Sequence, residues 1–548
     1  MVKFDEQMVE LVNLDCKEDF SEGENNFLCW VCEDDKGLSE ILDGNMAKRL
    51  TELVEIMPFP LTIVYEHYYV DRIYRDEYYS YYSKKHFEIS RNTKRLIFIK
   101  GKHEKNEFLD NEKMTHQRIE NDLIGMVVIK PTKTLGRMLI NPLLLDIPSC
   151  YVRITKFEIS IFGKIYSLEA FPFSGQDSEV MTCAEVNIWQ IMEYFGNRYK
   201  NYRTILPSEL LELVMDISDV RLLPSDGLTV EQESHVFMRN GLSPKIYYKR
   251  SEYDDGEYMK SYEQYPLAPT FEEILHFYVE SGIPILINLR EKDNEEGDNH
   301  SITCIGHALK GDLNSSDDGK MDFYNEKMID AKADEEYNKL SIFKSWVNCA
   351  GYVMMEDHSL PYQIKKIDDL RFSDDEDAIS YEIESFVVPL YKHVFMAAED
   401  AYEISINLIN QTQSGIIEGL QRNGVEAPYK IVIRLFLTTS RAYKDFRISK
   451  AKTINEKTFY SQVSFPKFIW ICEYGTMDTY SRHKAVGEFI LDATSAKYHI
   501  FEPVISIRNG DSITYRGPVD SIEYAHLRRN IAVMKEYDMF EQNNLKLI

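Results

Sequence analysis

Residues 206–355 contain a series of helix start and stop signals followed by strand patterns. Leu206-Pro207-Ser208 opens one helix, and the capping boxes Thr229-x-x-Gln232 and Thr270-x-x-Glu273 open two more. Gly241 and Gly282 lie where glycines end helices. Strand-like apolar runs follow at 245–249, 284–289, 301–305 and 351–355. This order predicts an α+β domain in which short helices pack on an antiparallel sheet.

A chain of 548 residues is longer than one hydrophobic core supports, so we expect three domains. Composition favours an N-terminal α/β or β-rich domain at 1–165, a central domain at 166–370 and a C-terminal α/β domain at 371–548. Acidic stretches at 308–350 and 368–377 read as a surface insertion and a linker. The expected elements outside the central domain are a helix at 45–56, strands at 61–70, 95–100, 125–130 and 157–161, a helix at 391–413, and strands at 430–437, 467–472 and 487–491.

The charge balance argues against nucleic acid as a direct ligand. The formal net charge is −27, whereas binding to phosphate backbones depends on Lys and Arg. The tyrosine-rich stretch 65–82 is the one segment that could stack bases, and we expect it to pack into a core or a protein interface instead. Apolar runs are shorter than a membrane span, and the acidic start differs from a signal peptide. We therefore expect a cytoplasmic protein without a membrane segment.

Eight cysteines are spread along the chain without a dense framework, as in compartments where thiols stay reduced. Cys29-Trp30-Val31-Cys32 could be half of a zinc site, but no second pair follows to complete four ligands. We expect neither a metal nor a cofactor.

Cys183 is the candidate nucleophile. It follows a loop and opens a helical pattern in which Ala184, Ile188, Ile191 and Phe195 face the core, with Gly196 expected to end the helix. The unsatisfied N–H groups and the positive dipole at a helix start stabilise a thiolate. This position therefore suits a cysteine that attacks carbonyl carbon.

His300 and an acid near residue 357 are the candidate partners of the thiol. His300 opens a strand after a polar loop, where an imidazole can exchange protons with a thiol. A later strand ends in Glu356-Asp357-His358, and an acid there can orient the imidazole. Either Glu356 or Asp357 fits this role. We expect His307 to be structural, since it lies further along the strand that begins with His300.

The order of Gln176, Cys183-Ala184, His300 and Asp357-x-x-x-Pro361-Tyr362 resembles the papain-like cysteine peptidases of the bacteriocin-processing, C39-like type. The resemblance covers roughly 173–362, about a third of the chain. It implies a papain-like fold with Cys183 as nucleophile, His300 as base, Asp357 as orienting acid and Gln176 as a donor to the oxyanion. Gln176 lies one residue further from the cysteine than is usual in the family. The flanking regions resemble parts of larger bacterial proteins.

These residues predict a cysteine peptidase that cleaves a peptide or protein through a thioester. One alternative passes the thioester to an amine, as an acyltransferase or transglutaminase-like enzyme does. Another is a scaffold or sensor with a degenerate core in a bacterial defence or regulatory assembly. A regulatory protein partner would fit an arrangement of three domains around one site.

Three acids of the last domain, Glu473, Glu488 and Asp492, could form a second site for a metal or for acid–base chemistry. We expect them instead to pair with the cations Arg434, Arg441 or Lys444, because carboxylates at strand ends are commonly neutralised in this way.

Overall fold

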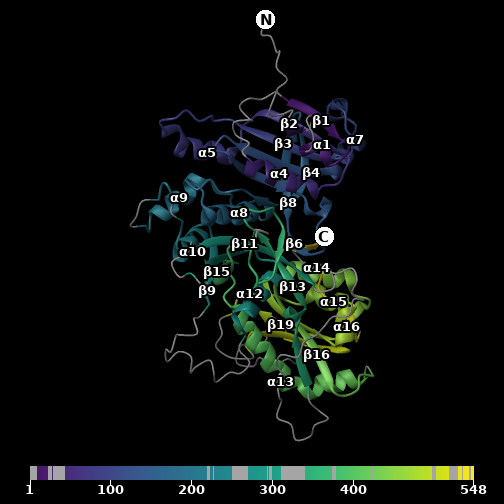
Figure 1. Ribbon diagram of the computed structural model, residues 1–548. Coiled ribbons are helices and arrows are strands. Elements are labelled where there is room, and N and C mark those ends of the chain that lie inside the picture. Colours follow the sequence, from purple (N-terminus) through teal and green to yellow (C-terminus); the bar gives the residue numbers. More distant parts are fainter. Residues whose placement is uncertain are drawn as a thin grey trace.

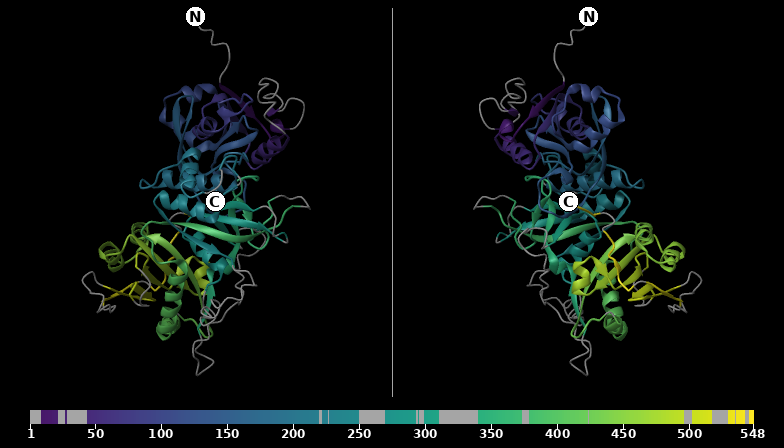
Figure 2. Two further views of the ribbon diagram at one scale, coloured as in Figure 1. Left: turned by 90° about the vertical axis from the view of Figure 1, so that its left-hand side faces the viewer. Right: turned by 90° about the vertical axis from the view of Figure 1, so that its right-hand side faces the viewer.

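The computed structural model describes residues 9–21, 27–28, 44–218, 222–225, 227–249, 269–292, 294, 299–309, 340–372, 378–422, 424–495, 502–516, 529–533, 535–541 and 545–548. They form three parts stacked along the long axis of the molecule, each built on one large sheet (Figures 1 and 2). One apolar core runs through all three parts and includes Leu61, Leu286 and Trp470. The mixture of helices and antiparallel sheets agrees with the expected α+β class.

The N-terminal sheet has the order β1-β2-β3-β4-β5-β8-β7, and each neighbouring pair is antiparallel. Its strands are β1 (Val9–Leu14), β2 (Leu61–Tyr69), β3 (Thr93–Lys100), β4 (Leu123–Lys130), β5 (Thr134–Ile140), β7 (Thr155–Ile161) and β8 (Lys164–Phe173). Its helices are α1 (Glu18–Ser21), α4 (Gly44–Glu55), α5 (Arg72–Ser80), α6 (Lys105–Leu109) and α7 (Lys113–Asp122).

The central sheet has the antiparallel order β14-β13-β11-β10-β15-β9, and the short strands β6 and β24 extend from β11. Its strands are β6 (Tyr151–Arg153), β9 (Leu242–Tyr248), β10 (Ile285–Glu291), β11 (His300–Leu309), β13 (Cys349–Met355), β14 (Gln363–Lys365), β15 (Tyr381–Tyr391) and β24 (Leu545–Leu547). The helices of this part are α8 (Cys183–Arg198), α9 (Pro207–Met215), α10 (Val230–Arg239) and α12 (Phe271–Glu280). Because β24 pairs with β6, the C-terminus of the chain lies beside the central sheet (Figure 1).

The predicted helix boundaries of the central part are confirmed with one exception. Thr229 and Thr270 cap α10 and α12, and each hydroxyl accepts a hydrogen bond from a backbone N–H at 3.3 Å. Gly241 and Gly282 follow these helices with φ of 87° and 67°, which glycine adopts without strain. Gly196 does not end α8, which continues to Arg198. A Cβ on Gly196 would lie 2.5 Å from the nitrogen of Thr204, so a close backbone approach explains this glycine.

The C-terminal sheet has the order β12-β16-β17-β19-β20-β21-β22. Only β12 and β16 run parallel among the strands that the structure describes in this sheet. Its strands are β12 (Leu340–Lys344), β16 (Tyr429–Thr439), β17 (Phe468–Gly475), β19 (Gly487–Asp492), β20 (Val504–Asn509), β21 (Ser512–Tyr515) and β22 (Arg529–Ala532), and the small pair is β18 (Lys484–Ala485) with β23 (Tyr537–Asp538). The helices are α13 (Ala398–Arg422), α14 (Ser440–Lys450), α15 (Ile454–Gln462) and α16 (Met477–Ser481).

Strands and strand pairings cross the domain boundaries that composition predicts. Residue 165 lies inside β8, because the turn at Phe162 and Gly163 closes the β7–β8 hairpin and does not separate domains. Strand β15 follows the boundary expected at 370, yet it fills the gap between β9 and β10 in the central sheet. Strand β12 lies within the expected central domain and pairs with β16 of the last sheet. The flanking parts are α+β rather than α/β, because their sheets are almost entirely antiparallel.

Parts of the expected insertion and linker, 310–339 and 373–377, lie outside the described residues. Within the described ranges, the search for a helix both long and apolar enough to cross a membrane finds none.

Candidate active site

Helix α8 begins at Cys183, as predicted. Thr182 precedes it in an extended conformation, and the cysteine itself is half-buried. Ala184, Ile188 and Phe195 are buried, so the helix is fixed by its apolar face. It packs against β11 of the central sheet and β8 of the N-terminal sheet, and Figure 1 shows it between these two parts. The thiol therefore occupies the first turn of a helix that is held from both sides.

The loop between Gln176 and Cys183 is held by one carboxylate. Asp177 Oδ1 accepts hydrogen bonds from the backbone N–H groups of residues 179–181 at 2.9–3.1 Å. Ser178 has φ of 59°, in the left-handed region. This tight turn determines the path of the chain from Gln176 to Cys183.

The tyrosine-rich stretch packs on this loop and on α8. Tyr74 and Tyr82 are buried in one apolar cluster with Val180, Met181 and Trp189. These two tyrosines pack as predicted and tie α5 to the segment that carries Cys183, whereas Tyr68 and Tyr79 of the same stretch are exposed.

Asn187 connects the helix of the cysteine to the strand of the histidine. Its Nδ2 donates to the carbonyl oxygen of Cys183 at 2.7 Å and to that of Ser301 at 2.8 Å. Its Oδ1 accepts from the hydroxyl of Thr303 at 2.6 Å. Asn187 is fully buried, so these bonds fix α8 relative to the start of β11.

His300, the first residue of β11, contacts both candidate partners. The Cys183 thiol lies close enough to its imidazole to raise the pKa of the histidine. Its Nε2 lies 2.9 Å from Glu356 Oε1 and 3.6 Å from Asp357 Oδ1. The carboxyl that is hydrogen-bonded to the histidine is therefore Glu356, whereas Asp357 is at ion-pair distance. With Nε2 facing the acids, Nδ1 is the nitrogen left for the thiol.

The charges of this cluster stabilise one another. Burial alone would lower the pKa of His300, but hydrogen bonds with Cys183 and Glu356 and the charge of Asp357 raise it to about 10. Burial opposes ionisation of Glu356 too, yet its bonds with His300 and His358 hold its pKa well below the usual range. Burial raises the pKa of Asp357. At neutral pH His300 is an imidazolium paired with the Glu356 carboxylate.

His358 and Gln176 complete the cluster. The nearby Asp357 and Glu356 carboxylates raise the pKa of His358 to about 9. Its Nδ1 lies 3.1 Å from Glu356 Oε1, and its Nε2 is 2.6 Å from the side-chain amide of Gln176. A protonated His358 pairs with the amide oxygen, since oxygen and nitrogen of an amide are assigned from their partners. The NH₂ group of Gln176 is then free to donate to a substrate.

Arg49 of the N-terminal part is hydrogen-bonded to the backbone of the turn that carries Glu356 and Asp357. Its Nη2 donates to the carbonyl oxygens of Asp357 at 2.7 Å and Ser359 at 3.1 Å. Burial lowers the pKa of Arg49, and the nearby Glu356 and Asp357 oppose that change. Helix α4 thus contributes a cation to a site that is otherwise built from the central part.

The structure thus brings Cys183, His300, Asp357 and Gln176 into one cluster. It adds Glu356 as the closer acid, which was the open alternative. Sequence reasoning did not single out Asn187, Arg49 or His358 as site residues. The only local signal for any of these is the adjacency of His358 to the two acids.

Two of the three candidate acids of the last part pair with arginines. Glu473 pairs with Arg434 at 3.0 Å, and Glu488 pairs with Arg447 at 2.9 Å. Asp492 accepts from the backbone N–H of Thr494 at 2.8 Å. Pairing with Arg434 is confirmed, while Arg447 replaces the other expected cations, Arg441 and Lys444. Arg441 instead lies 3.9 Å from Asp445, and Lys444 donates to the carbonyl of Val463.

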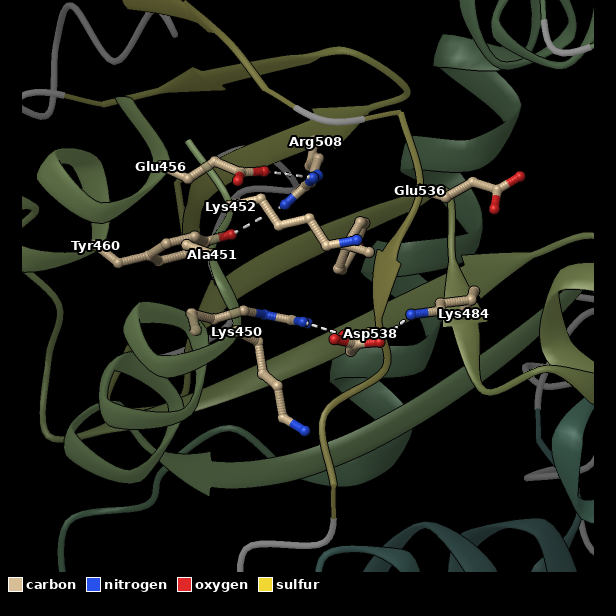
Figure 3. A pocket seen from close by; sticks show the side chains of 11 residues that line it. Lys450, Ala451, Lys452, Glu456, Tyr460, Lys484, Arg508, Glu536 and Asp538 are labelled. Atoms are coloured by element: carbon tan, nitrogen blue, oxygen red, sulfur yellow. Dashed lines mark hydrogen bonds and ion pairs between the residues drawn. The ribbon is translucent and has the colours of Figure 1, made fainter. Parts of the chain in front are cut away.

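A small pocket lies beside these arginines (Figure 3). Arg508 pairs with Glu456 at 2.9 Å on one side of it, and Lys484 pairs with Asp538 on the other. Water molecules have about 30 Å³ of room in this pocket.

Cys29 and Cys32 lie outside the described residues. No model of a known protein family matches the chain, and no curated protein matches it in sequence.

Proposed function

We propose that this protein is a papain-like cysteine peptidase in which Cys183, His300 and Glu356 form the catalytic triad. The single observation that carries the proposal is the contact of His300 with the Cys183 thiol on one side and with the buried Glu356 carboxylate, at 2.9 Å, on the other. An imidazole beside a sulfur at a helix start is the arrangement found at cysteine nucleophiles.

The reaction follows from these positions. The thiolate of Cys183 attacks the carbonyl carbon of a peptide bond, and the negative charge moves to the carbonyl oxygen. The backbone N–H of Cys183 and the NH₂ group of Gln176 stabilise this oxyanion. His300 gives its Nδ1 proton to the leaving amine, which breaks the C–N bond and leaves a thioester. Water then gives a proton to the neutral His300 and attacks the thioester. The C–S bond breaks, the acid is released, and the thiolate beside the imidazolium is restored.

Glu356 keeps the imidazole in the orientation required for both proton transfers. This assigns to Glu356 the orienting role that the resemblance gives to Asp357. Asp357 adds negative charge at 3.6 Å and supports the imidazolium without a hydrogen bond to it.

The test is digestion of a random peptide mixture by the full chain, with new termini identified by mass spectrometry. We expect cleavage by the wild type and none by Cys183→Ala. Cys349→Ala is the matched control, because Cys349 is also half-buried but lies at the other end of the central sheet strands. Cleavage that survives in Cys183→Ala would refute the proposal. Products joined to an added amine would assign the same thioester to acyl transfer.

A further inference from the structure

We propose that His300, Glu356, Asp357 and His358 form a zinc site that controls the cysteine nucleophile. One ligand atom of each side chain lies within 4.8 Å of the others. The inhibitory effect of zinc rests on the function proposed above, whereas zinc binding itself does not.

The distances match those of a tetrahedral ion. His300 Nε2 lies 2.9 Å from Glu356 Oε1 and 3.6 Å from Asp357 Oδ1. His358 Nδ1 lies 3.1 Å and 3.4 Å from the same two oxygens. Bonds of about 2.0–2.1 Å at the tetrahedral angle separate ligand atoms by about 3.3–3.4 Å. Zinc could therefore enter with only small side-chain movements.

Asp357 is the observation that points to a ligand. Its side chain is 1% exposed, yet neither of its carboxylate oxygens accepts a hydrogen bond from the described residues. A buried carboxylate without hydrogen bonds is costly unless a cation compensates for it. One of these oxygens already faces the imidazole nitrogens of His300 and His358 at ion-pair distance, in the space that a metal ion would occupy.

The donor set suits zinc rather than calcium or magnesium. Two imidazole nitrogens and two carboxylate oxygens are ligands that zinc accepts, while calcium and magnesium prefer oxygen alone. The His358 side chain is 60% exposed, so an ion can reach the cluster from solvent through this residue. The sequence predicts no metal here, because the histidine of β11 and the turn after β13 meet only in the folded chain.

Zinc would prevent catalysis without touching the thiol. Coordination uses the lone pair of His300 Nε2, and the proton of that nitrogen leaves to solvent. The hydrogen bond from Nε2 to Glu356 that orients the imidazole is then lost. A neutral ring bound to zinc is also a weaker acid than the imidazolium, so its Nδ1 proton is not given to the leaving amine. Zinc and Glu356 would thus compete for the same nitrogen of His300.

The experiment titrates the metal-stripped full chain with zinc chloride in competition with a chromophoric zinc chelator. We expect one zinc per chain in the wild type and unchanged affinity in Cys183→Ala, because the sulfur is not a ligand. Asp357→Asn and His358→Ala should weaken binding by about 100-fold or more, since even the loss of an outer partner costs about 10- to 100-fold. His86→Ala removes an exposed histidine elsewhere and is the matched control.

Three results would overturn the zinc site: no zinc on the wild type, equal affinity in all variants, or loss of binding in Cys183→Ala while Asp357→Asn retains it. If Asp357→Asn fails to fold, His358→Ala still tests the site, because His358 is exposed. Peptide cleavage is measured separately. Zinc binding without any cleavage would leave the site standing and refute the peptidase, and cleavage insensitive to a bound zinc would refute the inhibitory role.

Discussion

Asn187 donates from its side-chain nitrogen to the carbonyl oxygen of Ser301 at 2.8 Å, and the same nitrogen donates to the carbonyl of Cys183 at 2.7 Å. One buried amide therefore sets the distance between the residue that begins α8 and the strand that begins with His300. The alignment of thiol and imidazole depends on this side chain, although it touches neither reacting atom.

Replacing Asn187 with Ala should lower kcat/KM by about 10- to 100-fold, because an error of about 1 Å in alignment costs about that much. Stability should fall by about 1–3 kcal/mol, since the carbonyl of Ser301 and the hydroxyl of Thr303 lose a buried partner. Peptide cleavage and thermal unfolding measure the two effects. Asn197→Ala is the control: this exposed residue of α8 bonds the carbonyl of Glu193 at 2.7 Å. Equal effects of both variants would contradict the positioning role.

Glu356→Gln should reduce kcat by about 100-fold or more, whereas Asp357→Asn should reduce it by about 10-fold or less. The first change removes the carboxylate that is hydrogen-bonded to His300, and the second removes only an ion pair at 3.6 Å. Steady-state kinetics of both variants decide between the two acids. A larger loss in Asp357→Asn would restore that residue as the orienting acid.

Arg49→Met should lower kcat while leaving most of the fold intact. The substitution removes two hydrogen bonds to the turn that carries the acids, so Glu356 loses its fixed position. We expect a drop of about 10-fold, measured with the same peptide substrate. Lys48→Met, on the preceding residue, removes an exposed cation 3.8 Å from Glu52 and should change nothing. Full activity in Arg49→Met would show that the N-terminal part does not support the site.

The stabilisation that the protonated Glu233 side chain gives to the fold should decrease as the pH rises. Burial raises its pKa to about 8, against the bond from Asn288, which lowers it. The folded chain therefore keeps this proton between about pH 4.3 and pH 8, while the unfolded chain loses it. Its contribution is complete below that window and decreases as the pH rises through it. Thermal unfolding at about pH 6 and about pH 8.5 should show a smaller decrease in Glu233→Gln than in wild type; an equal decrease would contradict this account.

Signals carried by adjacent residues predicted much of the central part. The capping threonines of α10 and α12, the glycines after them and the start of α8 at Cys183 depend on contacts within one or two helical turns. The candidate nucleophile and histidine were predictable for the same reason, since each begins an element.

Contacts between distant segments were not predictable in this way. Arg49 and Asp357 are 308 positions apart, and no local pattern relates them. The preference of His300 for Glu356 over Asp357 depends on how the turn after β13 is held, which adjacent residues do not encode. The strand pairings across the expected domain boundaries were not predictable either, because β12, β15 and β24 pair with strands that are distant in sequence.

The most direct test of the central claim is covalent labelling of the full chain by a peptidyl epoxide, with the modified residue identified by peptide mapping. The account predicts rapid modification at Cys183, strong reduction in His300→Ala, and little modification of the exposed Cys16. Labelling of Cys183 at the rate of Cys16, or labelling that persists unchanged in His300→Ala, would contradict it.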